Sequence, residues 1–348
     1  MKDAVADPPD LAGTRDYSDS FGKVRPRVTD SRGETLSDFI KTLKPNYLVV
    51  YRDIALGYVL VIGALALAIV AERLGAPPIL VALPGAIWVG YWIAYLQLFI
   101  HEGAHWNLAP QRETSDRLCN LLISWWAGLE VKKYRKVHFQ HHRALGTVDD
   151  SEHTYFFPLN IVFIAKALLM VRVLEVVATR RKVLDKPGSK RSPEAEGQAE
   201  GPGLHKDLVI GALVHALVVG VLLWMGFWGS AVAWGAGVVV FFPFFGALRQ
   251  LLEHRDEHAR ADVDYREIDH GALARVFGDG LIARTFGGAG FNRHLLHHWE
   301  PGISYTRLPD LERFLNDTDL RPIMESRKTT YGRVFWRLFR GRVAHGVH

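Results

Sequence analysis

Four long runs of apolar residues constrain the fold of this chain more than any other feature. They cover residues 54–71, 78–100, 208–228 and 231–248, and no Asp, Glu, Lys or Arg interrupts them. A helix rises about 1.5 Å per residue, so about 20 apolar residues cross the roughly 30 Å of hydrocarbon in a bilayer. The runs do not alternate apolar and polar residues as barrel strands do. We therefore predict an all-α integral membrane protein with four transmembrane helices.

The spacing of the runs predicts two helical hairpins and an orientation. Six residues separate the first two runs and two residues separate the last two, and Arg73 is the only basic residue in these turns. Basic residues gather on the cytoplasmic side of membrane proteins. We therefore expect both termini and the connection 97–207 in the cytoplasm. Residues 1–46 are polar and show no secretory signal, so we expect the first span to direct insertion.

Composition divides the chain into three parts. We expect residues 1–45 to be a polar, partly disordered cytoplasmic segment and 46–323 to be the membrane domain. Within that domain, the Pro-, Gly- and Glu-rich stretch 186–203 is typical of a flexible linker. Residues 324–348 form a basic amphipathic tail that we expect to lie on anionic lipid.

Charge and cysteine content exclude several classes of protein. Lys and Arg number 42 and Asp and Glu 37, for a net charge of +5. The basic residues lie between apolar spans, which is not the distribution of a nucleic-acid-binding protein. The single cysteine, Cys119, excludes an internal disulfide framework and a thiolate cluster. A metal site in this chain must therefore be built from histidines and carboxylates.

Histidines fall into three groups beside the apolar runs. HEGAH carries His101 and His105; HFQHH carries His138, His141 and His142; HLLHH carries His294, His297 and His298. Positions i, i+3 and i+4 share one face of a helix, so each group can direct its imidazoles to one point. Four spans place all three groups on the same side of the membrane. We expect them to lie there in a helical cap in the cytoplasm. Eight imidazoles exceed what one tetrahedral zinc ion uses, so the pattern indicates two metal ions. Imidazole ligands suit iron, copper, zinc or nickel.

A further segment, LRQLLEHRDEH, ends with two more histidines. Either His254 or His258 can supply a ninth imidazole, because they lie one helical turn apart. Glu253 can orient a ligand by accepting its second ring N–H.

Together these segments resemble the histidine boxes of the membrane fatty acid desaturase/hydroxylase superfamily. LRQLLEHR resembles the family's Arg-then-Glu-His segment, and HHWEPGISYTRLPDLERFL resembles the stretch after its last box. The resemblance implies a four-span enzyme with a cytoplasmic diiron centre that uses dioxygen and two electrons. It implies nine ligands: His101, His105, His138, His141, His142, His254, His294, His297 and His298. His254 is preferred as the ligand from the segment LRQLLEHRDEH, and His258 is the alternative. Residues expected to support these ligands are Glu102, Asp150, Glu152, Glu253 and Asn292.

The expected function is therefore oxygen-dependent desaturation of a fatty-acyl or lipid-like chain, with hydroxylation (a monooxygenase reaction) as the alternative. An unactivated methylene has no useful acidity, so its oxidation needs a metal-bound oxidant rather than side-chain acid–base chemistry. The sequence contains no haem-binding His-Pro-Gly-Gly segment. We therefore expect electrons from a separate ferredoxin or cytochrome b5-type protein and its reductase.

Two other functions compete with this interpretation. HEGAH satisfies the H-E-x-x-H pattern of a zinc metalloprotease, and residues 254–258 satisfy the inverted pattern, but this reading leaves HFQHH and HLLHH unexplained. Metal transport needs a polar path through the spans, and only His215 qualifies; we expect it to be a neutral imidazole bonded across helices. Four aromatic residues are candidates for a substrate tunnel, although helix packing is favoured for them: Trp92, Tyr95, Trp125 and Trp126.

Overall fold

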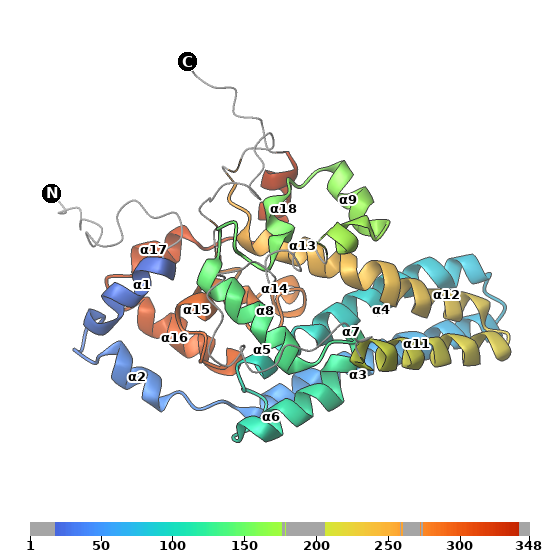
Figure 1. The fold of residues 1–348 in the computed structure, drawn as a ribbon, viewed down its shortest axis with the longest axis horizontal. Coiled ribbons are helices and arrows are strands. Elements are labelled where there is room, and N and C mark those ends of the chain that lie inside the picture. The colour runs from blue at the N-terminus through green and yellow to red at the C-terminus, as the bar shows by residue number, and fades with distance from the viewer. Residues whose placement is uncertain are drawn as a thin grey trace, which may run out of the picture.

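The computed structural model is helical and describes residues 18–175, 178, 206–257, 259, 272 and 274–340. Four helical stretches in these ranges are long and apolar enough to cross a membrane, which confirms the prediction of four spans. They are Tyr47–Arg73, Pro78–Ala104, Lys206–Trp224 and Trp228–His254. Figure 1 shows them side by side at one end of the molecule, while the shorter helices gather at the other. The described residues form isolated β-bridges but no sheet.

The first hairpin joins α3 (Tyr47–Arg73) to α4 (Pro78–Gln97). Asn46 caps α3 by accepting a hydrogen bond from the amide of Val49. The chain reverses at Gly75, whose φ of +88° is a left-handed conformation that glycine adopts without steric cost. Pro78 then begins α4, where its missing N–H is not needed. The sequence therefore determines both ends of this turn.

The second hairpin joins α11 (Lys206–Trp224) to a continuous helix made of α12 (Trp228–Ala236), the π-helical turn η5 (Gly237–Phe241) and α13 (Phe242–His254). Pro243 has no N–H to donate to the preceding turn, and the helix widens into the π-turn just before it. The helix continues beyond the apolar run and ends at His254. This extension carries a candidate ligand out of the span and into the cap.

The two hairpins pack through α4, which contacts both α3 and α12. At the closest approach, a Cβ on Gly90 would lie 2.8 Å from backbone atoms of Phe241 and Phe242. Only a residue without a side chain fits there. The π-turn is thus held directly against the middle of α4.

Glu72 joins the hairpins at their turn ends. Its carboxylate accepts hydrogen bonds from the backbone amides of Gly229 and Ser230 and from the Ser230 hydroxyl, the last two at 3.0 and 2.7 Å. These amides lie in the first turn of α12, where no helix carbonyl can reach them. We expect Glu72→Gln to lower the free energy of unfolding in detergent by about 1–3 kcal/mol, because a charged acceptor is lost. The control is Glu113→Gln, which removes an exposed ion pair with Arg117 on α6 (Arg112–Cys119). Thermal unfolding measures the difference, and equal melting temperatures of the two variants would contradict the assignment.

The cap consists of short helices from three parts of the chain. From the first connection come α5 (Phe99–Ala104), α6 (Arg112–Cys119), η2 (Asn120–Ser124), α7 (Trp125–Ala127), α8 (Val131–Ala144), η3 (His153–Phe156) and α9 (Ile161–Leu168). From the C-terminal part come α14 (Leu281–Thr285), η6 (Phe291–Arg293), α15 (His294–Trp299), η7 (Tyr305–Arg307), α16 (Leu308–Leu315), α17 (Arg321–Ser326) and α18 (Tyr331–Phe339).

The N-terminal segment also joins the cap. Residues 18–42, which the sequence assigned to a partly disordered region, form α1 (Ser18–Val24), η1 (Arg25–Arg27) and α2 (Leu36–Thr42). Phe21 stacks on Trp299 at 4.6 Å between ring centroids, and Phe39 stacks on Phe314 at 4.4 Å. These contacts bury aromatic surface. The expectation of partial disorder rests on the polar composition of the segment and does not take these aromatic residues into account. Residues 1–17, the predicted linker 186–203, His258 and the last eight residues of the tail lie outside the described residues.

Candidate metal centre

Four helices carry the predicted histidines to one place. His101 lies in α5, which continues the line of α4, and His105 follows directly at its C-terminal cap. The central helix α8 contributes three histidines, α13 contributes its last residue, and α15 contributes three more. The ligand-bearing segments of the two hairpins therefore meet in the cap, at one end of the spans (Figure 1).

The nine histidines form two separate groups. The five-histidine cluster consists of His101, His105, His138, His142 and His297, and the four-histidine cluster of His141, His254, His294 and His298. In each cluster one ring nitrogen from every residue lies within 4.8 Å of all the others. The helical repeat explains how α8 contributes to both clusters. His138 and His142 lie one turn apart and both belong to the five-histidine cluster, while His141 points in a different direction and belongs to the four-histidine cluster.

The distances between ring nitrogens fit metal coordination. In the five-histidine cluster, His101 Nε2 lies 2.8 Å from His297 Nε2, and His138 Nε2 lies 3.0 and 2.9 Å from those of His105 and His142. In the four-histidine cluster, His254 Nε2 lies 3.2 and 2.8 Å from those of His141 and His294. A metal ion about 2.0–2.1 Å from each nitrogen separates neighbouring ligand atoms by about 3 Å. The donor set and its spacing therefore fit two metal ions.

Burial favours the uncharged form of six of these imidazoles. It lowers the pKa of five of them well below the ordinary value: His138, His142, His294, His297 and His298. Burial also lowers the pKa of His105 to about 3, with a contribution from the positive charge of Arg135. Neutral imidazole has the lone pair that a metal ion needs, so the clusters are ready to bind metal at neutral pH.

Asp150 orients one of the histidines of the four-histidine cluster. Both carboxylate oxygens lie 2.9 Å from His141 Nδ1, and the Tyr155 hydroxyl donates to the same carboxylate. Asp150 and Tyr155 are fully buried. Burial raises the pKa of Asp150, while His141 opposes that rise. The bond fixes the His141 ring with Nε2 pointing at the cluster, as a carboxylate behind a metal-binding histidine does.

The other predicted supporting residues lie near the clusters in different ways. Glu102 accepts hydrogen bonds from the Ser304 hydroxyl at 3.3 Å and the Tyr305 amide at 3.2 Å, and its other oxygen lies 3.8 Å from His101 Nδ1. Glu152 Oε1 lies 3.9 Å from His138 Nδ1. These two carboxylates therefore stand behind the five-histidine cluster.

Glu253 and Asn292 brace the chain around the ligands. Glu253 accepts hydrogen bonds from Arg249 at 2.7 Å and the Tyr331 hydroxyl at 2.9 Å. Asn292 donates to the carbonyl of Gly278 at 2.7 Å. Their described contacts hold α13 to α18 and the start of α15 to the segment before α14.

A large cavity lies between the clusters and the spans. It has a volume of about 810 Å³ and touches histidines of both clusters: His101, His138, His141, His254 and His294. Its far walls are apolar residues of α11 and of the η5–α13 helix. Among the four aromatic candidates, Trp126 lines this cavity. Trp92 and Tyr95 are buried against each other, and Trp125 stacks on Trp126 at 4.0 Å.

His215 forms the expected bond across helices. Its Nε2 lies 3.2 Å from the carbonyl oxygen of Trp126, which joins α11 to α7. The ring therefore acts as a packing residue at the cavity wall rather than as one of the clustered ligands.

Several residues of the site were not predicted from the sequence. Tyr155, Ser304 and Tyr331 reach buried carboxylates by contacts that no spacing rule encodes. Arg249 packs over the Phe291 ring at 4.0 Å and lies in the segment LRQLLEHR, where its position four residues before Glu253 was a usable signal.

Comparison with known protein families gives a match over most of the chain. The family model described as "Fatty acid desaturase" matches residues 77–335, which include both clusters and three of the four spans. No curated protein matches the chain.

Proposed function

Because the chain belongs to the fatty acid desaturase family, a family of membrane diiron oxidoreductases, we propose that it desaturates a fatty-acyl or lipid-like chain with dioxygen. The observation that carries this proposal is the position of the cavity, which touches both histidine clusters at one end and apolar walls of the spans at the other. A lipid chain can therefore enter from the bilayer and place one carbon beside the clusters.

The proposal assigns each cluster one iron ion, held by the nine histidines. Bound iron supplies the redox chemistry that side chains lack, the activation of dioxygen for removing hydrogen from an alkyl carbon. The protein's own residues place the chain, exclude water and keep the ligands neutral. Asp150 holds the His141 ring in position from behind, and Glu102 lies 3.8 Å behind the His101 ring.

The zinc metalloprotease reading is less well supported. His101 and His105 belong to a cluster of five imidazoles, more than a tetrahedral catalytic zinc site uses. Glu102, which would be the general base, is 1% exposed and bonded to Ser304 and Tyr305. The inverted pattern depends on His258, which lies outside the described residues.

The proposal also includes a cytoplasmic location for the clusters and both termini. Its support is the distribution of basic residues, which avoids the two hairpin turns except for Arg73. Accessibility of cysteines introduced at the exposed Leu74 and at Lys41 to a membrane-impermeant reagent tests it. Labelling of the Leu74 position alone in intact cells is expected, and labelling of the Lys41 position alone would contradict it.

The proposed electron donor is a separate acidic redox protein of the ferredoxin or cytochrome b5 type. The histidines His105 and His142 are half-buried, and both lie away from the lipid cavity. Beside them, Trp106 has a positive φ of 58°, and the guanidinium groups of Arg112 and Arg135 pack over its ring at 4.4 and 4.1 Å from the ring centroid. A positive φ at a bulky residue is uncommon and is often found at functional sites.

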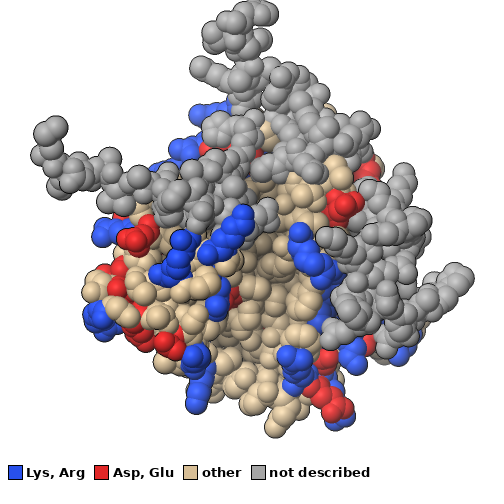
Figure 2. Space-filling view, turned by 60° about the vertical axis from the view of Figure 1, so that its left-hand side comes forward, with Lys and Arg blue, Asp and Glu red and all other residues tan. Residues whose placement is uncertain are grey.

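Basic residues continue around this surface. Lys136 and Arg143 are exposed on α8. In Figure 2, which turns the cap end toward the viewer, Lys and Arg side chains, with Asp and Glu side chains among them, lie around a largely uncharged central area. Such a surface attracts an acidic partner to the shortest path toward the metal ligands.

Reversing two of these charges is expected to weaken the association of the enzyme with its electron donor. In a variant with Lys136→Glu and Arg143→Glu, the KM for the donor protein should rise roughly tenfold, because exposed charges mainly set the rate of association. Turnover with dithionite as reductant should stay unchanged. Lys41→Glu on α2 is the control. An unchanged KM for the donor would remove the support for docking here.

Product analysis tests the proposed reaction. The chain is expressed in a host with compatible electron donors, and lipids are compared by mass spectrometry with those from a His138→Ala variant. Loss of two hydrogens is the expected result. Gain of one oxygen would replace the proposal with the hydroxylase alternative, and unchanged lipids from an iron-loaded, reducible enzyme would contradict both.

A further inference from the structure

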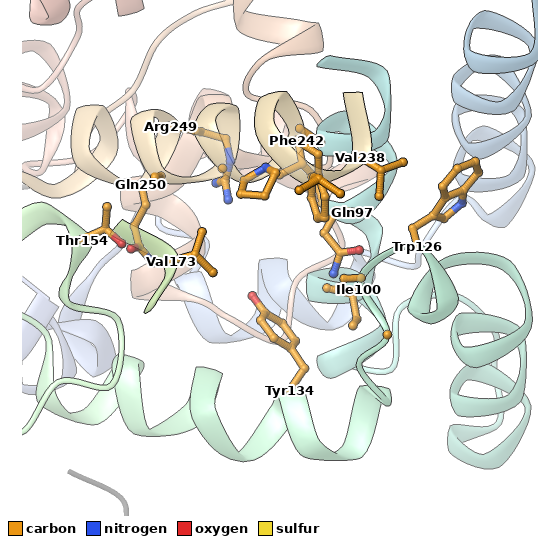
Figure 3. Close-up of a pocket in the computed structure, with 18 of the residues that line it drawn as sticks. Gln97, Ile100, Trp126, Tyr134, Thr154, Val173, Val238, Phe242, Arg249 and Gln250 are labelled. Atoms are coloured by element: carbon orange, nitrogen blue, oxygen red, sulfur yellow. The ribbon is translucent and has the colours of Figure 1, made fainter. Parts of the chain in front are cut away.

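The lipid cavity has a ring of polar side chains where it meets the metal clusters. Gln97 on α4, Tyr134 on α8, and Arg249 and Gln250 on α13 all line it. Figure 3 shows Gln97, Tyr134 and Arg249 directed toward the middle of the cavity, while Gln250 extends toward Thr154 and donates a hydrogen bond to Glu152. The far walls carry apolar side chains such as Leu208, Val219, Val238 and Phe242. The cavity is therefore polar near the clusters and apolar toward the bilayer.

Three of these residues share one relation to the proposed ligands. Gln97 precedes His101 by four residues, Tyr134 precedes His138 by four, and Gln250 precedes His254 by four. Residues four apart lie nearly one above the other on a helix, separated by about 6 Å along its axis. On each of three ligand-bearing helical segments, the position one turn before a ligand thus presents a polar group to the cavity. A polar group bound by this ring lies within about one helical turn of the clusters.

Gln97 has an unsatisfied hydrogen-bonding atom. Its amide oxygen is buried and has no hydrogen-bond partner among the described residues. Buried polar atoms in proteins nearly always have a partner, and exceptions need an explanation. The primary amide offers both a donor and an acceptor, and its two ends are interchangeable by rotation. It can therefore bond a hydroxyl or a carbonyl group of a molecule in the cavity.

Two other members of the ring are held in fixed positions. Tyr134 stacks on the His138 ring at 5.4 Å, with 9° between the ring planes. Arg249 is held by Glu253 on one side and packs over Phe291 on the other. Their polar ends are thereby placed before a ligand arrives, which lowers the cost of binding.

We propose that the substrate is a lipid with a hydroxyl or carbonyl group within a few bonds of the carbon that is oxidised, and that Gln97 bonds this oxygen. The inference rests on the proposed function and narrows it. A plain hydrocarbon segment at this position would leave the buried amide oxygen of Gln97 without a partner. The alkyl part of the lipid extends along α11 and the η5–α13 helix toward the bilayer.

Binding of a matched pair of probes tests this proposal without turnover. Octadecanol and octadecane compete with tritiated octadecanol for the purified protein in nanodiscs under argon, and their concentrations are expressed as mole fractions in the bilayer. The wild-type protein should bind octadecanol about tenfold more tightly than octadecane, the ratio expected for a single good hydrogen bond.

The variant Gln97→Leu should lose this discrimination, because leucine has similar size and no hydrogen-bonding group. This variant should bind octadecanol about tenfold more weakly than the wild-type protein does. It should bind octadecane at least as tightly as the wild-type protein does. Tyr134→Phe is a second variant on another helix and should reduce the same ratio. Val238→Ala, in the apolar wall, should weaken both probes in the same proportion.

The outcomes separate this inference from the proposed reaction. Equal binding of the two probes by the wild-type protein would overturn the inference, as would an equal loss of both in Gln97→Leu. Product analysis showing desaturation would stand in either case. Conversely, the probe ratio is measured without oxygen, so it remains informative if no oxidised lipid is found.

Discussion

Replacing His298 with alanine is expected to remove one of two bound iron ions and to abolish activity. His298 belongs to the four-histidine cluster, and its loss leaves three imidazoles there. Loss of a residue that only supports a ligand costs about 10–100-fold in metal affinity or activity, so loss of a ligand should cost more than about 100-fold. Iron content per chain, measured by plasma mass spectrometry, should fall from about two to about one.

The matched variant is His105→Ala in the other cluster. Four imidazoles remain there, and His105 is half-buried at the outer edge. We expect this variant to retain more iron than His298→Ala, although its activity also falls. If His298→Ala kept its full metal content while His105→Ala lost all of it, a single site built on HEGAH would be the better description.

Replacing Asp150 with alanine is expected to weaken metal binding at the four-histidine cluster by about 10–100-fold. The carboxylate lies 2.9 Å from His141 Nδ1 and accepts a hydrogen bond from the Tyr155 hydroxyl, and all three side chains are buried. Without it, the His141 ring loses the contact that fixes its orientation, and a buried N–H is left without an acceptor. Metal competition with a chelator at pH 7 measures the loss.

The controls for this prediction lie in the same loop. Asp149→Ala, at an exposed neighbouring position, should leave chelator resistance unchanged. Tyr155→Phe should produce a smaller loss than Asp150→Ala, since the carboxylate stays. Equal chelator resistance in Asp150→Ala and the wild-type protein would show that the Asp150–His141 contact does not support a metal ligand.

The spans and the histidine groups were predictable because both depend on local order. An apolar run of sufficient length is a membrane helix in almost any context, and i, i+3, i+4 spacing places imidazoles on one helical face. The close approach at Gly90 and the π-turn before Pro243 were not predictable, since they depend on how α4 meets the second hairpin.

The division of the nine histidines into two clusters depends on contacts between helices. Spacing shows that His138 and His142 share a face of α8, but not that His297 joins them and His254 joins His141. The same limit applies to the helices α1 and α2, because Phe21 and Phe39 stack on Trp299 and Phe314, which lie far away along the chain. The polar ring around Gln97 could be read only once a cavity joined three helices.

The central claim is that two iron ions lie side by side, each held by imidazoles of one cluster. Iron analysis combined with X-ray absorption spectroscopy of the purified wild-type protein tests it most directly. The account predicts about two iron ions per chain in a shell of nitrogen ligands close to 2.1 Å, with sulfur absent from that shell. A preparation that binds a single zinc ion and no iron, while folded and stable, would contradict it.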